Sequence, residues 1–207
     1  MKAPASSSKK SILLIFLKNS EQGKVKTRLA QTVGDEKALE IYKKLKAYTF
    51  SIASQTKADK QLWFSNYLPE KHALPKSLND AAVKVQVGDS LGERMKRGFQ
   101  QVFDEGYSKA VIIGSDCAQL KSRHLQNAFD ALSTSNVVIG PARDGGYYLL
   151  GMNAYLPSLF DDIDWSSERV YRQTVAKIKE GKHSYTALEP LNDVDTEADW
   201  QEVDGIL

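Results

Sequence analysis

An uninterrupted run of apolar residues near the start of the chain constrains the fold more than any other feature. Residues 11–18 read Ser-Ile-Leu-Leu-Ile-Phe-Leu-Lys, with no polar residue between Ile12 and Leu17. A strand with one solvated face alternates apolar and polar residues, whereas a strand buried on both faces does not. This segment therefore predicts a strand in the interior of a parallel sheet.

The same kind of pattern predicts the other elements. Further strands are expected at residues 61–65, 83–87, 109–113, 137–140, 147–152 and 185–188. Helices are expected at residues 35–56, from 91 to Gly106, at 122–132 and 166–180, and after the capping sequence 196–199. Alternating strands and helices predict one three-layer α/β/α domain with a mainly parallel mixed sheet over residues 11–207. A disordered tail is expected over residues 1–10.

Two helices have a predicted buried face. Apolar residues at the i, i+3, i+4 spacing mark one side of the helix at 35–56: Ala38, Ile41, Tyr42, Leu45, Tyr48, Thr49, Ile52 and Ala53. In the helix that begins near residue 91, the predicted inner face is Leu91, Met95, Phe99, Val102 and Phe103, and Gly106 is the predicted left-handed cap.

The charge balance gives no general argument for a polyanionic partner. The chain has 28 basic and 26 acidic residues, and its net charge of +2 does not indicate a nucleic-acid or membrane-surface partner. The apolar run after the tail is far too short for a membrane span. The single cysteine, Cys117, excludes an intrachain disulfide. We expect a cytoplasmic protein without a membrane span.

Ligands of open α/β sheets bind beyond the carboxyl ends of the strands, so the loops that follow strands are the candidate sites. The first, residues 18–28, places four basic residues around Gly23: Lys18, Lys24, Lys26 and Arg28. Glycine permits a close approach of the backbone, and lysine and arginine neutralise phosphate oxygens. A solvated basic loop is an equally good interpretation, because neither a P-loop nor a dinucleotide fingerprint is present.

The second loop follows the apolar segment 109–113 and places Asp116 at the carboxyl end of that strand. A carboxylate there can hold Mg²⁺, which in turn bridges phosphate oxygens. The alternative is that Asp116 caps the next helix. Ser122 is the better placed cap, which favours the metal role for Asp116. Cys117 is interpreted as a small buried residue rather than a nucleophile.

The third and fourth loops have two interpretations each. The sequence Asp144-Gly145-Gly146 is either a plain hairpin turn or, with the tyrosines after it, a wall for a sugar or a base. Asp193 and Asp195 lie on an extended segment before the last helix. One of them is a candidate second metal ligand, and helix capping is the alternative role.

In this order, the loops resemble those of the nucleotide-diphospho-sugar transferase superfamily, which has the GT-A-like fold. Within it the chain is most similar to the bacterial DUF2064 or "transferase 1" group. The similarity covers nearly the whole chain and rests on six stretches: FLKNSEQGKVKTRL (16–29), QVGDSLGERM (86–95), IGSDCAQL (113–120), GPARDGGYYLLG (140–151), DWSSERV (164–170) and DVDTEAD (193–199).

The resemblance implies roles for individual positions. The nucleotide would contact two segments: Lys18, Gly23, Lys24, Lys26, Thr27 and Arg28 in the first, and Gly88, Leu91, Gly92 and Arg94 in the second. Asp116, with Asp195, would hold Mg²⁺ or Mn²⁺, and the catalytic set would be Lys26, Arg28, Asp116 and Asp144. The sugar or acceptor would face Asp144, Gly145, Gly146, Tyr147 and Trp165.

The chain departs from the family pattern at several positions. Ser20, Gln22 and Ala118 stand where the family usually has prolines, which alters loop stiffness more than chemistry. Many GT-A glycosyltransferases use Asp-x-Asp for the metal, whereas here Cys117 and Ala118 follow Asp116. A lone aspartate is more like the nucleotidyltransferases of the same fold.

These features suggest three functions. The first is a metal-dependent glycosyltransferase that uses a nucleotide-diphosphate sugar and a small-molecule acceptor. The alternative is a nucleotidyltransferase, in which a phosphorylated acceptor attacks a nucleoside triphosphate and pyrophosphate leaves. A non-catalytic nucleotide-sensing module is least favoured, because the set of charged loops is intact. Nothing in the sequence selects a base, a sugar, an acceptor or an oligomeric state.

Overall fold

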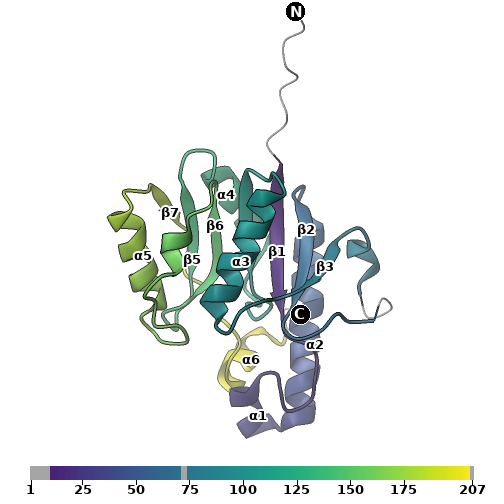
Figure 1. Ribbon diagram of the computed structural model, residues 1–207. Helices are drawn as coiled ribbons and strands as arrows, with labels where there is room; N and C mark the ends of the chain where they lie inside the picture. The colour runs from purple at the N-terminus through teal and green to yellow at the C-terminus, as the bar shows by residue number, and fades with distance from the viewer. Residues whose placement is uncertain (1–9, 71–73, 206–207) are drawn as a thin grey trace, which may run out of the picture.

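The computed structural model describes residues 10–70 and 74–205 (Figure 1). In this part of the chain, one sheet has the strand order β3-β2-β1-β4-β6-β5-β7. Its strands are β1 (Ser11–Leu17), β2 (Asp59–Phe64), β3 (Ala82–Val85), β4 (Lys109–Ile113), β5 (Val137–Pro141), β6 (Tyr147–Met152) and β7 (Tyr185–Ala187). Strand β6 runs antiparallel to β4 and β5, and the other pairs are parallel. The predicted mainly parallel mixed sheet is confirmed.

Helices cover both faces of this sheet. Helices α2 (Asp35–Ser54) and α4 (Ser122–Ala131) pack on one face, and α3 (Leu91–Asp104), α5 (Val170–Glu180) and the short η3 (Pro157–Phe160) pack on the other. The side chains of β1 alternate between the two cores: Leu13, Ile15 and Leu17 enter the first, and Ile12, Leu14 and Phe16 the second. The run that predicted a doubly buried strand therefore forms the centre of a three-layer α/β/α arrangement.

A third apolar cluster lies beyond the carboxyl ends of the strands. Helices α1 (Thr27–Val33) and α6 (Glu197–Val203) lie below the sheet in Figure 1, at the end toward which β1 points. They pack against the first half of α2 through Leu29, Ala38, Ile41, Leu45, Ala118, Val194, Trp200 and Val203. This cluster supports the loops that leave β1 and β4.

Two of the predicted helix caps are confirmed and one is wrong. Gly106 adopts a left-handed conformation after α3, and Thr196 caps α6 in a capping box with Asp199, as predicted. Ser122 is wrong as a cap, because it is the first residue of α4. Lys121 stands at the cap position, and its backbone N–H donates to Nδ1 of His124 at 3.0 Å.

Two further predictions are wrong and one helix was missed, each for a local reason. Helix α1 was not predicted, because its seven residues bury only Leu29 and carry no apolar stripe. Helix α5 begins at Val170 instead of residue 166, since Ser166 has a left-handed backbone (φ 67°) that no helix accommodates. Leu91 is 50% exposed rather than inward, because Gly92 is the residue that faces the neighbouring loop.

Some predictions lie beyond the described residues. The predicted tail falls outside them except for Lys10. Within residues 10–70 and 74–205, no helix is both long and apolar enough to cross a membrane. The cytoplasmic location stays a prediction.

Candidate functional site

The sheet changes its direction of winding between β1 and β4. From β1 the chain moves outward to β2 and β3, and from β4 it continues on the opposite side of β1. The crevice outside the carboxyl ends of two such strands is the usual ligand site of an open α/β sheet. The loops that leave these two strands carry Lys26 and Asp116, so the topology brings the first two candidate loops together.

Lys26 joins three of the candidate segments through ion pairs. Its Nζ lies 3.0 Å from Oδ1 of Asp116 and 3.4 Å from Oδ1 of Asp195. The Lys26 side chain is only 4% exposed, whereas those of Asp116 and Asp195 are 39% and 38% exposed. The two predicted metal carboxylates therefore converge on one cation position and remain open to solvent. We call them the carboxylate pair.

Arg28 contributes a second, looser contact to the carboxylate pair. Its Nη1 lies 3.5 Å from Oδ2 of Asp195, and its side chain is 75% exposed. An exposed ion pair of this kind adds little to stability. Arg28 therefore remains available for an anion that approaches from solvent.

The backbone at Lys26 is strained. It adopts a left-handed conformation (φ 49°, ψ 45°) immediately before α1. This region costs a residue other than glycine about 1–2 kcal/mol. Burial lowers the pKa of Lys26. The negative charges of Asp116 and Asp195 together raise it by more, so the pKa is raised overall and the side chain stays charged. Strain of this kind is typical of functional sites.

Neither member of the carboxylate pair caps a helix. Asp116 lies well before α4, and its backbone oxygen accepts a hydrogen bond from the N–H of Val194 at 3.0 Å. Thr196 caps α6: its N–H donates to Asp199 at 2.8 Å, and its Oγ1 accepts from the Asp199 N–H. The alternative roles for Asp116 and Asp195 are therefore excluded.

Asp193 lies beside the carboxylate pair. Burial raises the pKa of its carboxyl group to about 7, the charge of Asp116 raises it further, and that of Lys26 opposes the rise. No ion pair joins Asp193 to Lys26 within the described residues, whereas Asp195 has one. Asp193 therefore adds to the acidic surroundings of the site without sharing the cation position.

The carboxylate pair offers oxygen donors to a divalent cation. The described residues contain no group of three or more His, Cys, Asp or Glu side chains arranged to hold a metal. Mg²⁺, however, is commonly held by one or two carboxylates, with substrate phosphates and water completing its coordination. Two partly exposed carboxylates that converge on one point fit this mode.

Sequence reasoning missed two residues that fix the loops. The hydroxyl of Tyr42, on α2, accepts from the Lys18 N–H and donates to the Lys18 carbonyl, both at 2.9 Å. Oγ of Ser115 donates to the same hydroxyl at 3.4 Å. Burial raises the Tyr42 pKa to about 12. Tyr42 thus ties the end of β1 to the residue before Asp116, although its spacing indicated only core packing.

Asn19 does the same for the neighbouring loop. It is buried, and its Oδ1 accepts from the N–H of Asn66 at 3.0 Å while its Nδ2 donates to the Tyr67 carbonyl at 3.0 Å. The loops after β1 and β2 are therefore held together. No motif in the sequence singled out Asn19.

The predicted nucleotide segment after β3 is tightly folded. Nε of Arg94 donates to the carbonyl of Gly88 at 2.8 Å, and Ser90 caps α3 by accepting from the Glu93 N–H. Leu91 is exposed at the start of α3. A Cβ at Gly92 would overlap the indole of Trp165. Gly92 and Trp165, predicted for the nucleotide and for the acceptor, are therefore in direct contact.

The predicted acceptor loop is a hairpin turn that packs on the segment before α5. Oδ1 of Asp144 accepts from the Gly146 N–H at 2.9 Å, and a Cβ at Gly145 would overlap the carbonyl of Glu168. Tyr147 and Trp165 pack against the core beneath α3. The turn geometry is confirmed, and the acceptor role of these residues stays a prediction.

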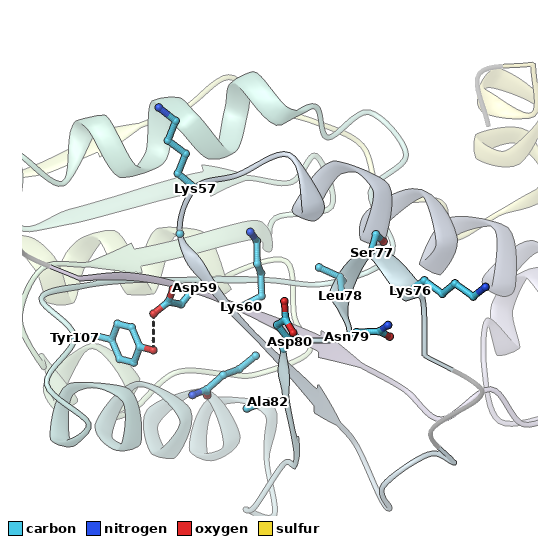
Figure 2. A pocket seen from close by; sticks show the side chains of 13 residues that line it. Lys57, Asp59, Lys60, Lys76, Ser77, Leu78, Asn79, Asp80, Ala82 and Tyr107 are labelled. Carbon is cyan, nitrogen blue, oxygen red and sulfur yellow. Dashed lines mark hydrogen bonds between the residues drawn. The ribbon is translucent and has the colours of Figure 1, made fainter.

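A separate hollow of about 500 Å³ lies at the amino ends of β2 and β3 (Figure 2). Its lining includes Lys57, Lys60 and Asp80. Asp59 accepts from the Tyr107 hydroxyl there at 2.9 Å. None of the predicted site residues line it, because they lie at the carboxyl ends of the strands.

Comparison with known proteins identifies the family. The model of the DUF2064 family, described as an uncharacterized protein conserved in bacteria, matches residues 48–167. The chain belongs to the DUF2064 family. A crystal structure from Desulfovibrio desulfuricans G20, described provisionally as a nucleotide-diphospho-sugar transferase, is 33% identical with a TM-score of 0.82. The match covers 94% of this chain and 95% of that one.

More distant structures of this DUF2064 protein's fold include 4-diphosphocytidyl-2C-methyl-D-erythritol synthase, with a TM-score of 0.61 and 11% identity over 96% of this chain and 98% of that one. Rv0371c from Mycobacterium tuberculosis H37Rv, in complex with manganese, has a TM-score of 0.57 and 14% identity over 95% and 99% of the two chains. A search of curated proteins gives no significant match. The predicted family and the nucleotide-diphospho-sugar transferase fold are confirmed.

Proposed function

We propose that this DUF2064 protein is a nucleotide-utilising transferase that moves a glycosyl group from a nucleotide-diphosphate sugar to a small acceptor. The observation that carries the proposal is the convergence of Lys26, Asp116 and Asp195 outside the carboxyl ends of β1 and β4. Oxygen donors beside fixed positive charges suit a diphosphate. The 33% identical relative, with its provisional description, supports the same reaction.

Each residue of the site has a proposed role. Asp116 and Asp195 would hold Mg²⁺ or Mn²⁺, which when bound neutralises charge on the departing diphosphate. Lys26 and Arg28 would add positive charge at the phosphates, with Lys18, Lys24, Gly23 and Thr27 along the same loop. Gly88, Leu91, Gly92 and Arg94 would flank the nucleoside. Asp144, Gly145, Gly146, Tyr147 and Trp165 would face the sugar or acceptor.

Nucleotidyl transfer is the second candidate, and one observation favours it. The residue two positions after Asp116 is Ala118, which is buried in the cluster beneath α1 and α6 and supplies no second metal carboxylate. The Asp-x-Asp arrangement of many GT-A glycosyltransferases is therefore absent. In-line attack on an α-phosphate could use the same charges, because such chemistry rests on positioning and electrostatics.

Thermal stability with a panel of ligands separates these functions. Purified protein with Mg²⁺ is heated with nucleoside triphosphates and, separately, with nucleotide-diphosphate sugars. A ligand at a hundredfold excess over its dissociation constant stabilises the folded state by about 2.7 kcal/mol. Selective stabilisation by a nucleotide sugar supports glycosyl transfer, and selective stabilisation by a triphosphate supports nucleotidyl transfer. No stabilisation by any nucleotide would refute both.

Substitution of Asp116 tests the placement of the site. Asp116→Asn should abolish the metal-dependent part of the shift, because an amide does not neutralise a divalent cation as a carboxylate does. Asp130→Asn, on the exposed side of α4, is the matched control and should leave the shift unchanged. An unchanged shift in Asp116→Asn would remove Asp116 from the metal site.

A further inference from the structure

We propose that the ammonium group of Lys26 occupies the cation position of the carboxylate pair in the ligand-free protein, and that a divalent cation displaces it toward the nucleotide phosphates. Lys26 would then make metal binding and nucleotide binding depend on each other. This inference rests on the proposed function and assigns Lys26 as a positioning residue in addition to its place in the phosphate site.

The geometry sets up the competition. The ammonium nitrogen lies within 3.4 Å of one oxygen from each member of the carboxylate pair. A divalent cation that binds those same oxygens would lie beside the positive charge of Lys26, and like charges at this separation repel each other. The two carboxylate oxygens therefore cannot be paired with Lys26 and bound to a divalent cation at the same time.

The other charged groups around the pair leave Lys26 as the principal competitor. Arg28 contacts the second oxygen of Asp195 through an exposed side chain. Asp193 is acidic and favours any cation at this position. Among the described residues, Asp116 forms its ion pair with Lys26 alone.

Displacement would carry the lysine toward the phosphates. A lysine side chain has a flexible four-carbon stem, so its ammonium can move while the left-handed backbone before α1 stays in place. Phosphate oxygens that bridge the metal lie beside the carboxylate pair and offer the released ammonium a new partner. A metal ion that binds alone has to break the ion pairs of Lys26 with Asp116 and Asp195. When a nucleotide binds with the metal, its phosphates give Lys26 new partners in place of those carboxylates. The two ligands should therefore bind cooperatively.

Binding of Mn²⁺, followed by electron paramagnetic resonance of the free ion, tests this directly. Lys26→Met removes the competitor and should bind Mn²⁺ alone about tenfold more tightly than the unaltered protein. It should also lose most of the gain in Mn²⁺ affinity that a nucleoside diphosphate gives the unaltered protein. Lys37→Met, which removes an exposed ammonium group of α2 that pairs with Glu40, is the matched control and should change the affinity for Mn²⁺ alone far less.

The outcomes separate this inference from the proposed function. Equal or weaker Mn²⁺ binding by Lys26→Met would overturn the displacement while leaving a metal site at the carboxylate pair. If neither protein binds Mn²⁺ with or without a nucleotide, the displacement and the metal-dependent function both fail.

Chemical acetylation of the unaltered protein, read by mass spectrometry, needs no substitution. Lys26 should resist acetylation without ligands, because its side chain is 4% exposed. Mn²⁺ should make it reactive, and Mn²⁺ with a nucleoside diphosphate should protect it again. Lys24, whose side chain is 71% exposed, should react without ligands and with Mn²⁺ alone. A Lys26 that stays protected in saturating Mn²⁺ would overturn the proposal.

Discussion

Tyr42 holds two loops of the candidate site in place, although its own side chain is not part of the site. Its hydroxyl bonds both backbone groups of Lys18 and accepts from Ser115, so it links the exits of β1 and β4. Those exits lead to Lys26 and Asp116. The separation of the basic loop from the carboxylate pair therefore depends on a buried side chain of α2.

At the residue scale, we predict that Tyr42→Phe lowers both stability and ligand affinity. The change removes two partly buried hydrogen bonds to the backbone of Lys18, each worth about 0.5–1.5 kcal/mol. Urea unfolding measures this loss, and the ligand-induced thermal shift measures the affinity. Tyr48→Phe, which removes one hydrogen bond to the Leu120 carbonyl, is the control. Equal effects on ligand affinity in both variants would refute the proposal that Tyr42 holds the loops after β1 and β4 in place.

At the scale of elements, α3 and the loop before α5 meet at a glycine. A side chain at Gly92 would overlap the indole of Trp165, which also stacks on Phe160 of η3 at 6.3 Å between ring centroids. The segment predicted for the nucleotide and the segment predicted for the acceptor are thus packed against each other.

We predict that the effect of Gly92→Ala depends on Trp165. Alanine normally stabilises a helix by about 1 kcal/mol relative to glycine, but overpacking at this contact should cost about 1–3 kcal/mol. Gly92→Ala should therefore destabilise the unaltered protein in chemical denaturation. In a Trp165→Ala background the same change should become neutral or stabilising. Destabilisation of equal size in both backgrounds would show that the indole contact is not the cause.

Glu105, just after α3, joins that helix to the edge of the sheet. It accepts from Lys84 of β3 at 2.6 Å and from Gln61 of β2 at 2.9 Å. Partial burial raises the pKa of Glu105. The hydrogen bonds from Lys84, Gln101 and Gln61 together lower it by more, so the net shift is downward. A carboxylate with a lowered pKa contributes stability above its unfolded pKa, and this contribution is lost as pH falls through the folded pKa.

We therefore predict that Glu105→Gln lowers the melting temperature at pH 7. The difference from the unaltered protein should shrink as pH falls below the ordinary glutamate value of about 4.3, because Glu105 then becomes protonated in the folded and unfolded states. Differential scanning calorimetry across this range measures the trend. A difference that grows on acidification would contradict the assigned sign.

At the scale of the whole molecule, local patterns predicted the layers and the order of elements. The apolar run of β1 and the alternation of strands and helices can be recognised from residues that are close together in the sequence. Local backbone geometry was harder to predict: the left-handed Ser166 delays α5, and the short α1 buries too little to show a stripe. Leu91 was misplaced because contact with Trp165 decides which residue faces inward.

The residues of the candidate site were singled out from the sequence, and the resemblance paired Asp116 with Asp195, but the ion pairs of Lys26 were not predicted. Lys26, Asp116 and Asp195 were all singled out, yet their convergence depends on β1 and β4 being neighbours in the sheet. No spacing in the sequence gives that adjacency. Lys26 was predicted to meet phosphates, and its pairing with both metal candidates came only from the structure. Tyr42 and Asn19 were missed because their polar groups bond partners far away in the sequence.

A divalent cation and a nucleotide are proposed to bind together at the carboxylate pair, outside the ends of β1 and β4. Crystals grown with Mn²⁺ and a nucleoside diphosphate test it through the anomalous scattering of manganese. We predict an anomalous peak coordinated by Asp116 and Asp195, with the diphosphate beside Lys26 and Arg28. A fully occupied manganese elsewhere in the molecule, or a nucleotide bound away from these residues, would contradict it.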